Sequence, residues 1–206
     1  MAAPDPFTPT PLFAFPLFSS APGGFDAHRE GLIREILEHK QRYPGVVRSN
    51  RKAWHSGEEL LDQVGPHLTW LIAAAMTYGR RALGQYYQDW TTHELHLGSI
   101  WANVTGPGGW NAPHHHFPAH WSGVFYIAAR GLGSGATDDL AGTIEFLNPT
   151  PWQAIWGRSG NFAYVPQEGV ILLFPSSLVH FVHPHAGDED RISVAFNFNV
   201  TPKCGT

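Results

Sequence analysis

The sequence has little cysteine, no long apolar run and no signal-like start, and each shortage excludes a class of protein. Cys204 is the only cysteine among 206 residues, so no disulfide forms within the chain, and a reducing compartment such as the cytoplasm is expected. The longest helical apolar run, at 71–76, is far shorter than the roughly 20 residues of a membrane span. The first residues lack the basic stretch and apolar run of a signal peptide. We therefore expect a cytoplasmic protein with no membrane partner.

Charge is also scarce. Charged residues make up 15% of the chain, its net charge is −4 and no basic run occurs, so nucleic acid is not an expected partner. Hydrophobic residues make up 43%, which is enough for a packed core and excludes a disordered chain. The expected partner is a small-molecule substrate, and the sequence leaves a homodimer open.

Two segments in the first 90 residues have the apolar spacing of helices. The first runs from Asp26, the expected N-cap, to Tyr43. The second begins at Pro66 and reaches about Leu83 or Tyr87, after the spacing of a capping box at 56–59. Before them, the segment 11–18 has the proline content of an edge strand. Residues 1–90 are therefore predicted to be mostly helical.

The remaining chain has the pattern of β-structure. Its 22 glycines and 17 prolines favour many tight turns, and residues 192–200 alternate strictly between apolar and polar side chains. A Gly- and Asp-rich loop is expected at 131–142. Further strands are predicted at 95–104, 121–128, 143–147, 162–165 and 170–174. The fold class is thus mainly β with flanking helices (α+β), in which one domain, 1–206, has a helical part at 1–90 and an antiparallel β-core at 91–202.

The spacing of three histidines indicates a metal-binding site. His114 and His116 form a His-x-His on an expected extended segment, so both rings point to the same side and His115 points away. His180 follows a distant apolar strand and turn, and a closed β-core can bring it to the pair to bind one metal ion. Arg191, at the start of the clearest strand, would need an anionic partner if it points inward; otherwise it forms a surface ion pair with the acidic residues before it.

Together these residues resemble a group of 2-oxoglutarate/Fe(II) oxygenases in the prolyl-hydroxylase-like superfamily, whose core is a double-stranded β-helix of the jelly-roll or cupin-like type. The resemblance covers most of the chain. The resemblance implies that His114, His116 and His180 bind iron and that Arg191 and Ser193 hold the distal carboxylate of 2-oxoglutarate. It also implies cosubstrate contacts from Asn103 and Tyr126. The motifs that carry it are Ser49-Asn50, Trp54-His55-Ser56, Trp101-Ala102-Asn103, Asn111 with His114 and His116, Ser122 to Tyr126, Phe174 to His180, and Arg191-Ile192-Ser193.

His116 departs from the superfamily pattern, because a carboxylate usually occupies this position. Either the site is a three-histidine site, or a carboxylate elsewhere, such as Glu145, completes it. His120 is a spare candidate that is expected to line the pocket or the surface, and His183 and His185 are assigned to a loop.

Aromatic residues are assigned mainly to packing. Trp54, His55 and Trp101 are expected in the core. Four further tryptophans could shape a substrate pocket, although large aromatic side chains fill cores more often. These are Trp110, Trp121, Trp152 and Trp156.

The function implied by the resemblance is hydroxylation of a C–H bond in a small, amino-acid-derived substrate. The cofactors would be Fe(II), 2-oxoglutarate and O2, with decarboxylation of 2-oxoglutarate to succinate, and no catalytic residue beyond the metal centre is required. Halogenation, desaturation and ring formation would use the same chemistry. Two alternatives use the same residues: a cupin-type metalloenzyme (a dioxygenase or isomerase) that does not use 2-oxoglutarate, and a non-enzymatic jelly-roll protein that binds a ligand. Arg191 separates the first two, and bound iron separates both from the third.

Overall fold

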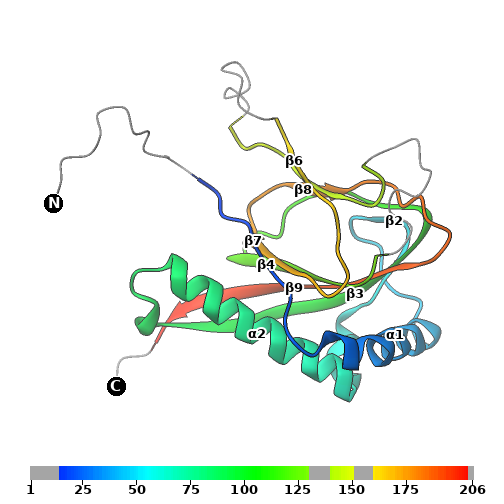
Figure 1. Cartoon of the computed structure of the whole chain (residues 1–206), viewed down its shortest axis with the longest axis horizontal. Helices are drawn as coiled ribbons and strands as arrows, with labels where there is room; N and C mark the ends of the chain where they lie inside the picture. The colour runs from blue at the N-terminus through cyan, green and yellow to red at the C-terminus, as the bar shows by residue number, and fades with distance from the viewer. Residues whose placement is uncertain (1–13, 130–139, 151–159, 204–206) are drawn as a thin grey trace.

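The computed structural model describes residues 14–129, 140–150 and 160–203 (Figure 1). Cys204, Trp152, Trp156 and most of the predicted loop at 131–142 lie outside these segments. None of the helices within them is long and apolar enough to cross a membrane.

The helices are close to the predicted ones. They are α1 (Phe25–Arg42), η1 (Glu58–Gln63), α2 (Pro66–Tyr86) and η2 (Trp90–Thr92). The N-cap of α1 is Gly24 and not Asp26, because the backbone there is left-handed (φ +89°), a conformation that glycine adopts at low cost. The predicted capping box is also absent: the hydroxyl of Ser56 accepts the backbone N–H of Ala102 (3.0 Å).

The strands form a curled antiparallel sheet. They are β1 (Phe18–Ser20), β2 (Asn50–His55), β3 (His93–His114), β4 (Trp121–Ala128), β5 (Ile144–Phe146), β6 (Phe162–Tyr164), β7 (Ile171–Pro175), β8 (His180–Val182) and β9 (Arg191–Pro202). Their order is β1-β7-β4-β9-β3-β8-β5-β6, with β2 paired to the other side of β3. β3 therefore belongs to both halves of the core: its first part pairs with β9, and its end pairs with β8.

Two predictions about these strands need correction. The edge strand β1 runs from Phe18 to Ser20, so of the described residues in the predicted segment 11–18 only Phe18 belongs to it, although β1 is at the edge of the sheet as expected. The first 90 residues also contain β2, whose polar start, Asn50 to Lys52, hides the alternation of a strand.

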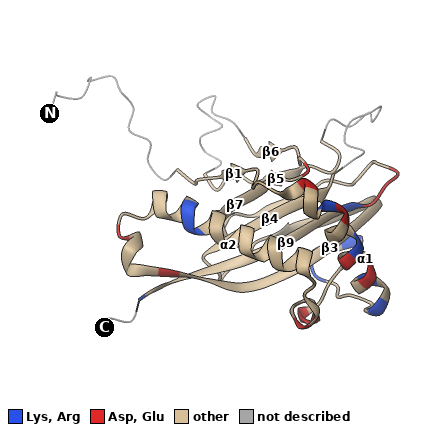
Figure 2. Ribbon diagram, turned by 60° about the horizontal axis from the view of Figure 1, so that its bottom comes forward, with Lys and Arg blue, Asp and Glu red and all other residues tan. Residues whose placement is uncertain are grey.

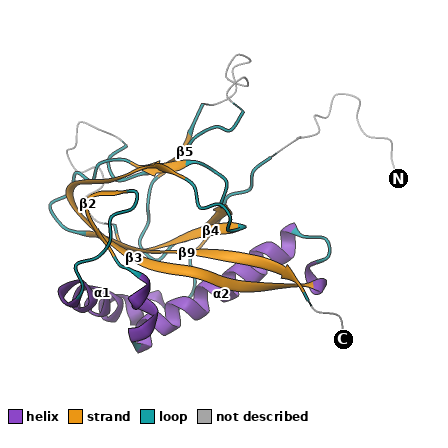
Figure 3. Ribbon diagram, turned by 180° about the vertical axis from the view of Figure 1, so that it is seen from behind, coloured by secondary structure: helices purple, strands orange, loops and turns teal. Residues whose placement is uncertain are grey.

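Both long helices cover one face of the sheet (Figures 1 and 3). The apolar residues of β9, including Phe196 and Phe198, are fully buried in the layer between sheet and helices. The helix backbone approaches closely at Gly79 of α2, where a Cβ atom would lie 2.7 Å from the ring of Phe198. The predicted β-core with N-terminal helices packed on it is confirmed.

A smaller apolar cluster lies on the other face of the sheet. It is formed by Val124, Tyr126, Ile144, Phe146, Leu172, Phe174, Leu178 and Val182. The alternating strands thus send one set of side chains toward the helices and the other set toward the inside of the curl. Figure 2 shows few charged residues over β4, β7 and β9.

Candidate metal and cosubstrate site

A cavity of about 890 Å³ opens on the inner face of the curled sheet. Its wall is contributed by β2, β3, β4, β8 and β9, and by the segment after β2. From β9 the residues that alternate with its large apolar side chains face it: Arg191, Ser193, Ala195 and Asn197. β9 therefore contributes mostly polar side chains to the cavity, because its apolar face packs under the helices.

The three candidate histidines meet in this cavity. His114 at the end of β3 is the direct cross-strand partner of His180 at the start of β8. His116 follows two residues later, where its backbone N–H donates to the carbonyl of Ser176 (2.9 Å). The ring nitrogens that the three offer all lie within 4.8 Å of one another. His115 is exposed, as the alternation predicts.

Backbone hydrogen bonds fix which ring nitrogen of two histidines faces the cavity. Nδ1 of His114 donates to the carbonyl of Ala112 (2.7 Å), and Nδ1 of His180 donates to the carbonyl of Leu178 (2.9 Å). A carbonyl can only accept, so Nδ1 carries the proton and Nε2 keeps a free lone pair. The two rings are therefore held in the tautomer that binds a metal through Nε2.

The electrostatics keep these rings neutral. Burial, and to a smaller extent the other imidazoles nearby, lowers the pKa of His180 to about 3 and that of His116 to about 4. Burial also lowers the pKa of His114. Neutral imidazoles are the form that binds divalent metal ions, so the cluster is ready to bind one at neutral pH.

Arg191 lies in the same cavity and is 3% exposed. It makes no ion pair within the described residues, its Nε has no hydrogen-bond partner, and its guanidinium carbon lies 5.3 Å from the ring centre of Tyr126. The expected surface ion pair is absent, because Asp190 lies 3.6 Å from Lys40 instead. A buried guanidinium without a carboxylate is costly, so the site is built to receive an anion.

The other predicted cosubstrate residues form a row beside Arg191. Ser193 on β9 is directly opposite Asn103 on β3 and Tyr126 on β4. All three side chains are buried, and the hydroxyl of Tyr126 has no hydrogen-bond partner in the described residues. Thr105, which the sequence did not single out, is opposite Arg191 and also has a buried hydroxyl without a partner. Tyr126 lines the cavity, so its hydroxyl can donate to a carboxylate there, whereas Thr105 is not among the residues that line it.

Residues 99–197 match the sequence model of a family described as "Putative 2OG-Fe(II) oxygenase". The matched segment contains the three histidines, Arg191 and the row formed by Asn103, Tyr126 and Ser193. Over this segment the chain is similar to the 2-oxoglutarate/Fe(II) oxygenase family. No curated protein matches its sequence.

Solved structures agree on the fold of this chain. The collagen prolyl hydroxylase vCPH of Paramecium Bursaria Chlorella virus-1 is 14% identical, with a TM-score of 0.57 over 88% of this chain and 94% of its own. The epimerase SnoN of nogalamycin biosynthesis is 14% identical, with a TM-score of 0.64 over 91% and 81%. HygX of Streptomyces hygroscopicus, solved with nickel, 2-oxoglutarate and hygromycin B, is 12% identical, with a TM-score of 0.57 over 93% and 84%. The predicted double-stranded β-helix core is confirmed.

The residues present fit the two cofactors of the family, Fe(II) and 2-oxoglutarate. Three neutral imidazoles form a suitable donor set for Fe(II). The buried Nε of Arg191 and the hydroxyl of Tyr126 lack partners, and a carboxylate between them would satisfy both. The cavity therefore offers a place for each cofactor.

Glu145 does not join the histidines. It alternates outward from Ile144 and Phe146 on β5, where it accepts a hydrogen bond from Nε2 of His183 (2.6 Å) and one from Asn161 (2.6 Å). The hypothesis that Glu145 completes the ligand set is wrong for this arrangement, and the cluster found among the described residues contains histidine alone.

Within the described residues, the other histidines and tryptophans named in the sequence analysis do not join the metal cluster. His120 is exposed and accepts the N–H of Val200, so it lies at the surface and not in the pocket. His183 and His185 follow β8 in a loop, as predicted. Trp121 packs in the layer under the helices, and Trp110 does not line the cavity.

His55 and Trp101 line the cavity, which corrects their assignment to the core. Their rings are stacked with centroids 5.6 Å apart and planes 7° apart, and Trp101 also lies 5.3 Å from the ring of His116. Trp54 does pack against the core. Neighbouring residues of a strand point to opposite faces, so alternation along β2 places Trp54 and His55 on different sides. β2 was not identified as a strand from the sequence, and this difference was therefore not predicted.

Proposed function

We propose that this protein is an oxygenase that hydroxylates a C–H bond of a small-molecule substrate with Fe(II), 2-oxoglutarate and O2. The observation that carries the proposal is the arrangement of one cavity. Three neutral imidazoles converge on one point there, and a buried arginine without a carboxylate partner lines the same cavity. A metal-binding cluster beside an anion-binding group is what a chelating dicarboxylate cosubstrate requires.

His114, His116 and His180 are the proposed iron ligands. The backbone bonds at Ala112 and Leu178 hold two of the rings in the binding tautomer, and the position of His116 is set by its backbone bond to Ser176. Such supporting bonds orient the ligands before the metal arrives.

Arg191 and Ser193 are the proposed partners of the distal carboxylate of 2-oxoglutarate, with Asn103 and Tyr126 as further contacts. The guanidinium can hold a carboxylate through two parallel hydrogen bonds, and burial of this end of the cavity excludes the water that would compete for it. The cupin-type alternative gives no reason for a buried, unpaired arginine at this position.

When bound, iron and 2-oxoglutarate supply the oxidising chemistry, in which O2 provides one oxygen atom to succinate and one to the substrate while CO2 is released. The residues of the chain bind and orient the reactants. A cavity of about 890 Å³ is of the size that holds a small molecule. A small, amino-acid-derived substrate is therefore proposed.

The test is turnover of 2-oxoglutarate by the purified, Fe(II)-loaded protein with a pool of small metabolites. We expect succinate to form only with O2 present, together with a product 16 mass units heavier than its precursor, as insertion of one oxygen atom requires. His180→Ala should abolish both signals and His115→Ala should keep them. Succinate formation without any oxygenated product would contradict the hydroxylase proposal, and the absence of succinate would contradict the use of 2-oxoglutarate.

A further inference from the structure

The charged side chains that line the cavity differ in whether they have a partner within the chain. They are Arg48, Arg51, Glu58, Glu59 and Arg191. Arg191 is assigned above to 2-oxoglutarate. Glu59 is engaged within the chain, because its Oε1 accepts the N–H of Gly57 (2.9 Å) and lies 3.6 Å from Nε2 of His39. Two arginines and Glu58 remain for a substrate.

Arg48 and Arg51 are exposed at the edge of the cavity and have no carboxylate partner within the described residues. Arg51 donates through Nη1 only to the backbone carbonyls of Arg48 and Asn50, both at 2.9 Å. The side chain of Arg48 makes no hydrogen bond or ion pair in the described part of the chain. Glu58 is also exposed and pairs with neither arginine. Arg48 and Arg51 are therefore two guanidinium groups at the cavity that no carboxylate of the described residues contacts, although the lining glutamates, Glu58 and Glu59, equal them in number.

The segment that carries the two arginines runs beside the histidine cluster. The hydroxyl of Ser49 lies 3.4 Å from Nε2 of His114 and accepts the side-chain N–H of Asn111 (3.2 Å). Asn50 is buried, and its side chain donates to the carbonyls of Val46 and Ala53. The backbone of this segment is thus held in place, and both arginines on it line the cavity.

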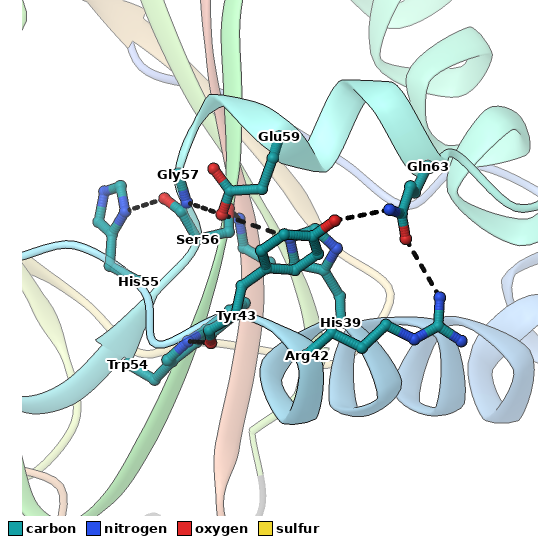
Figure 4. A network of polar contacts seen from close by, with 10 residues as sticks. His39, Arg42, Tyr43, Trp54, His55, Ser56, Gly57, Glu59 and Gln63 are labelled. Atoms are coloured by element: carbon teal, nitrogen blue, oxygen red, sulfur yellow. Dashed lines mark hydrogen bonds and ion pairs between the residues drawn. The ribbon is translucent and has the colours of Figure 1, made fainter.

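His55 lines the same cavity as Arg48. Burial lowers the pKa of His55, and the positive charge of Arg48 acts in the same direction. Its Nδ1 donates to the carbonyl of Ser56 (2.6 Å), so Nε2 is an acceptor. Figure 4 shows how the wall beside His55 is held: Nδ1 of His55 points to the carbonyl of Ser56, His39 lies near Glu59, and Arg42 and Tyr43 contact Gln63 of η1. Arg48 and His55 line the same cavity as the three histidines.

We propose that the substrate of this site is a small molecule with an oxyanion group, a carboxylate or a phosphate ester, which Arg48 and Arg51 hold at the edge of the cavity while its reacting carbon lies beside the histidines. This inference rests on the function proposed above. Both arginines can donate two hydrogen bonds to an oxyanion. They supply a selectivity for anions that the stacked rings of His55 and Trp101, which offer a flat surface and an acceptor nitrogen, do not.

The experiment measures binding of small charged probes to the full chain loaded with Zn(II), which cannot be oxidised, and saturated with 2-oxoglutarate. Metal and 2-oxoglutarate binding are measured first by calorimetry, and failure at this step contradicts the proposed function. The probes are then acetate, its neutral isostere acetamide, and inorganic phosphate, each titrated by calorimetry.

We expect saturable binding of acetate or phosphate, and no binding of acetamide. Arg48→Ala and Arg51→Ala should each lower the affinity for the anion by roughly threefold to tenfold, because each removes a partly exposed charge-assisted hydrogen bond. Added salt should lower this affinity further. Arg80→Ala, which removes an exposed arginine of α2 away from the cavity, is the matched control and should change nothing. Preference for acetate assigns a carboxylate substrate, and preference for phosphate assigns a phosphate ester.

Three results would overturn the inference while leaving the proposed function intact. The first is metal and 2-oxoglutarate binding without any binding of acetate or phosphate. The second is equal affinity for acetate and acetamide, and the third is an anion affinity that neither arginine variant changes.

Discussion

His114 and His180 stand directly opposite each other on β3 and β8, with their ring centroids 4.4 Å apart. Each ring donates Nδ1–H to a carbonyl two residues before it in its own chain segment. The pair is therefore oriented by the backbone of two neighbouring strands. A metal site built in this way should tolerate surface mutations and depend strongly on its own three rings.

The first prediction concerns these rings. His114→Ala, His116→Ala and His180→Ala should each lower metal affinity by at least about a hundredfold, since each removes one of three ligands. His115→Ala should leave it nearly unchanged, because this exposed side chain is not part of the three-histidine cluster. Calorimetric titration with Fe(II) under anaerobic conditions checks all four. An equal loss for His115→Ala and His116→Ala would contradict the assignment of the middle ligand.

The second prediction concerns Arg191. Arg191→Ala should weaken 2-oxoglutarate binding by at least about tenfold, corresponding to 1.4 kcal/mol or more, while metal affinity stays nearly intact. Arg191→Lys should lose less, because it keeps the charge without the paired hydrogen bonds. Titration of the metal-loaded protein with 2-oxoglutarate measures both, and unchanged affinity in Arg191→Ala would favour the cupin-type alternative.

The third prediction concerns the start of α2, which no side chain of its own segment caps. The carboxylate of Glu35 on α1 accepts the N–H groups of His67 (3.0 Å) and Leu68 (2.8 Å) instead. Glu35→Ala should lower the free energy of unfolding by about 1–2 kcal/mol, the usual value of an N-terminal cap. Urea denaturation checks this against Glu38→Ala, an exposed glutamate of the same helix. Equal losses in the two variants would show that the cap contributes nothing.

The fourth prediction is a pH dependence of stability through Glu145. Burial opposes ionisation of this carboxyl, but the hydrogen bonds from His183 and Asn161 outweigh it and hold its pKa below the ordinary value of 4.5. A lowered pKa in the folded state means that the stabilisation is present above the unfolded pKa and is lost as the pH falls through the folded value.

Glu145→Gln should therefore cost about 1 kcal/mol or less at pH 7, and the difference from the wild type should disappear in acid. Denaturation of the metal-free protein at a series of pH values measures it. Glu94→Gln, at an exposed glutamate beside His96 (3.7 Å), is the control and should show a smaller difference. A constant difference at every pH would contradict the titration of Glu145 as its cause.

The sequence predicted the β-core well where alternation was long, as in β9, and located β4 to the residue. It did not show which face of β9 would be the inside. Ile192 to Val200 supply apolar side chains to the helix-covered face, and the polar partners of the same strand line the cavity. Which face of β9 lines the cavity depends on where α1 and α2 pack, and the local sequence of β9 does not determine that packing.

The candidate site was predicted in part for a similar reason. His114 and His116 are readable as a pair because they are two residues apart, whereas their contact with His180 required the pairing of β3 with β8. His55 and Trp101 were assigned to the core, because an aromatic ring has the same sequence signature in a core as in a cavity wall. Arg48 and Arg51 carried no signal, since isolated arginines are ordinary surface residues.

The most direct test of the central claim is a titration of the anaerobic protein with Fe(II) and then 2-oxoglutarate, followed by visible absorption. Chelation of iron by 2-oxoglutarate produces a metal-to-ligand charge-transfer band. We predict that this band appears in the wild type, is absent in His180→Ala, and needs a higher 2-oxoglutarate concentration in Arg191→Ala. Iron binding without the band at any 2-oxoglutarate concentration would contradict the account.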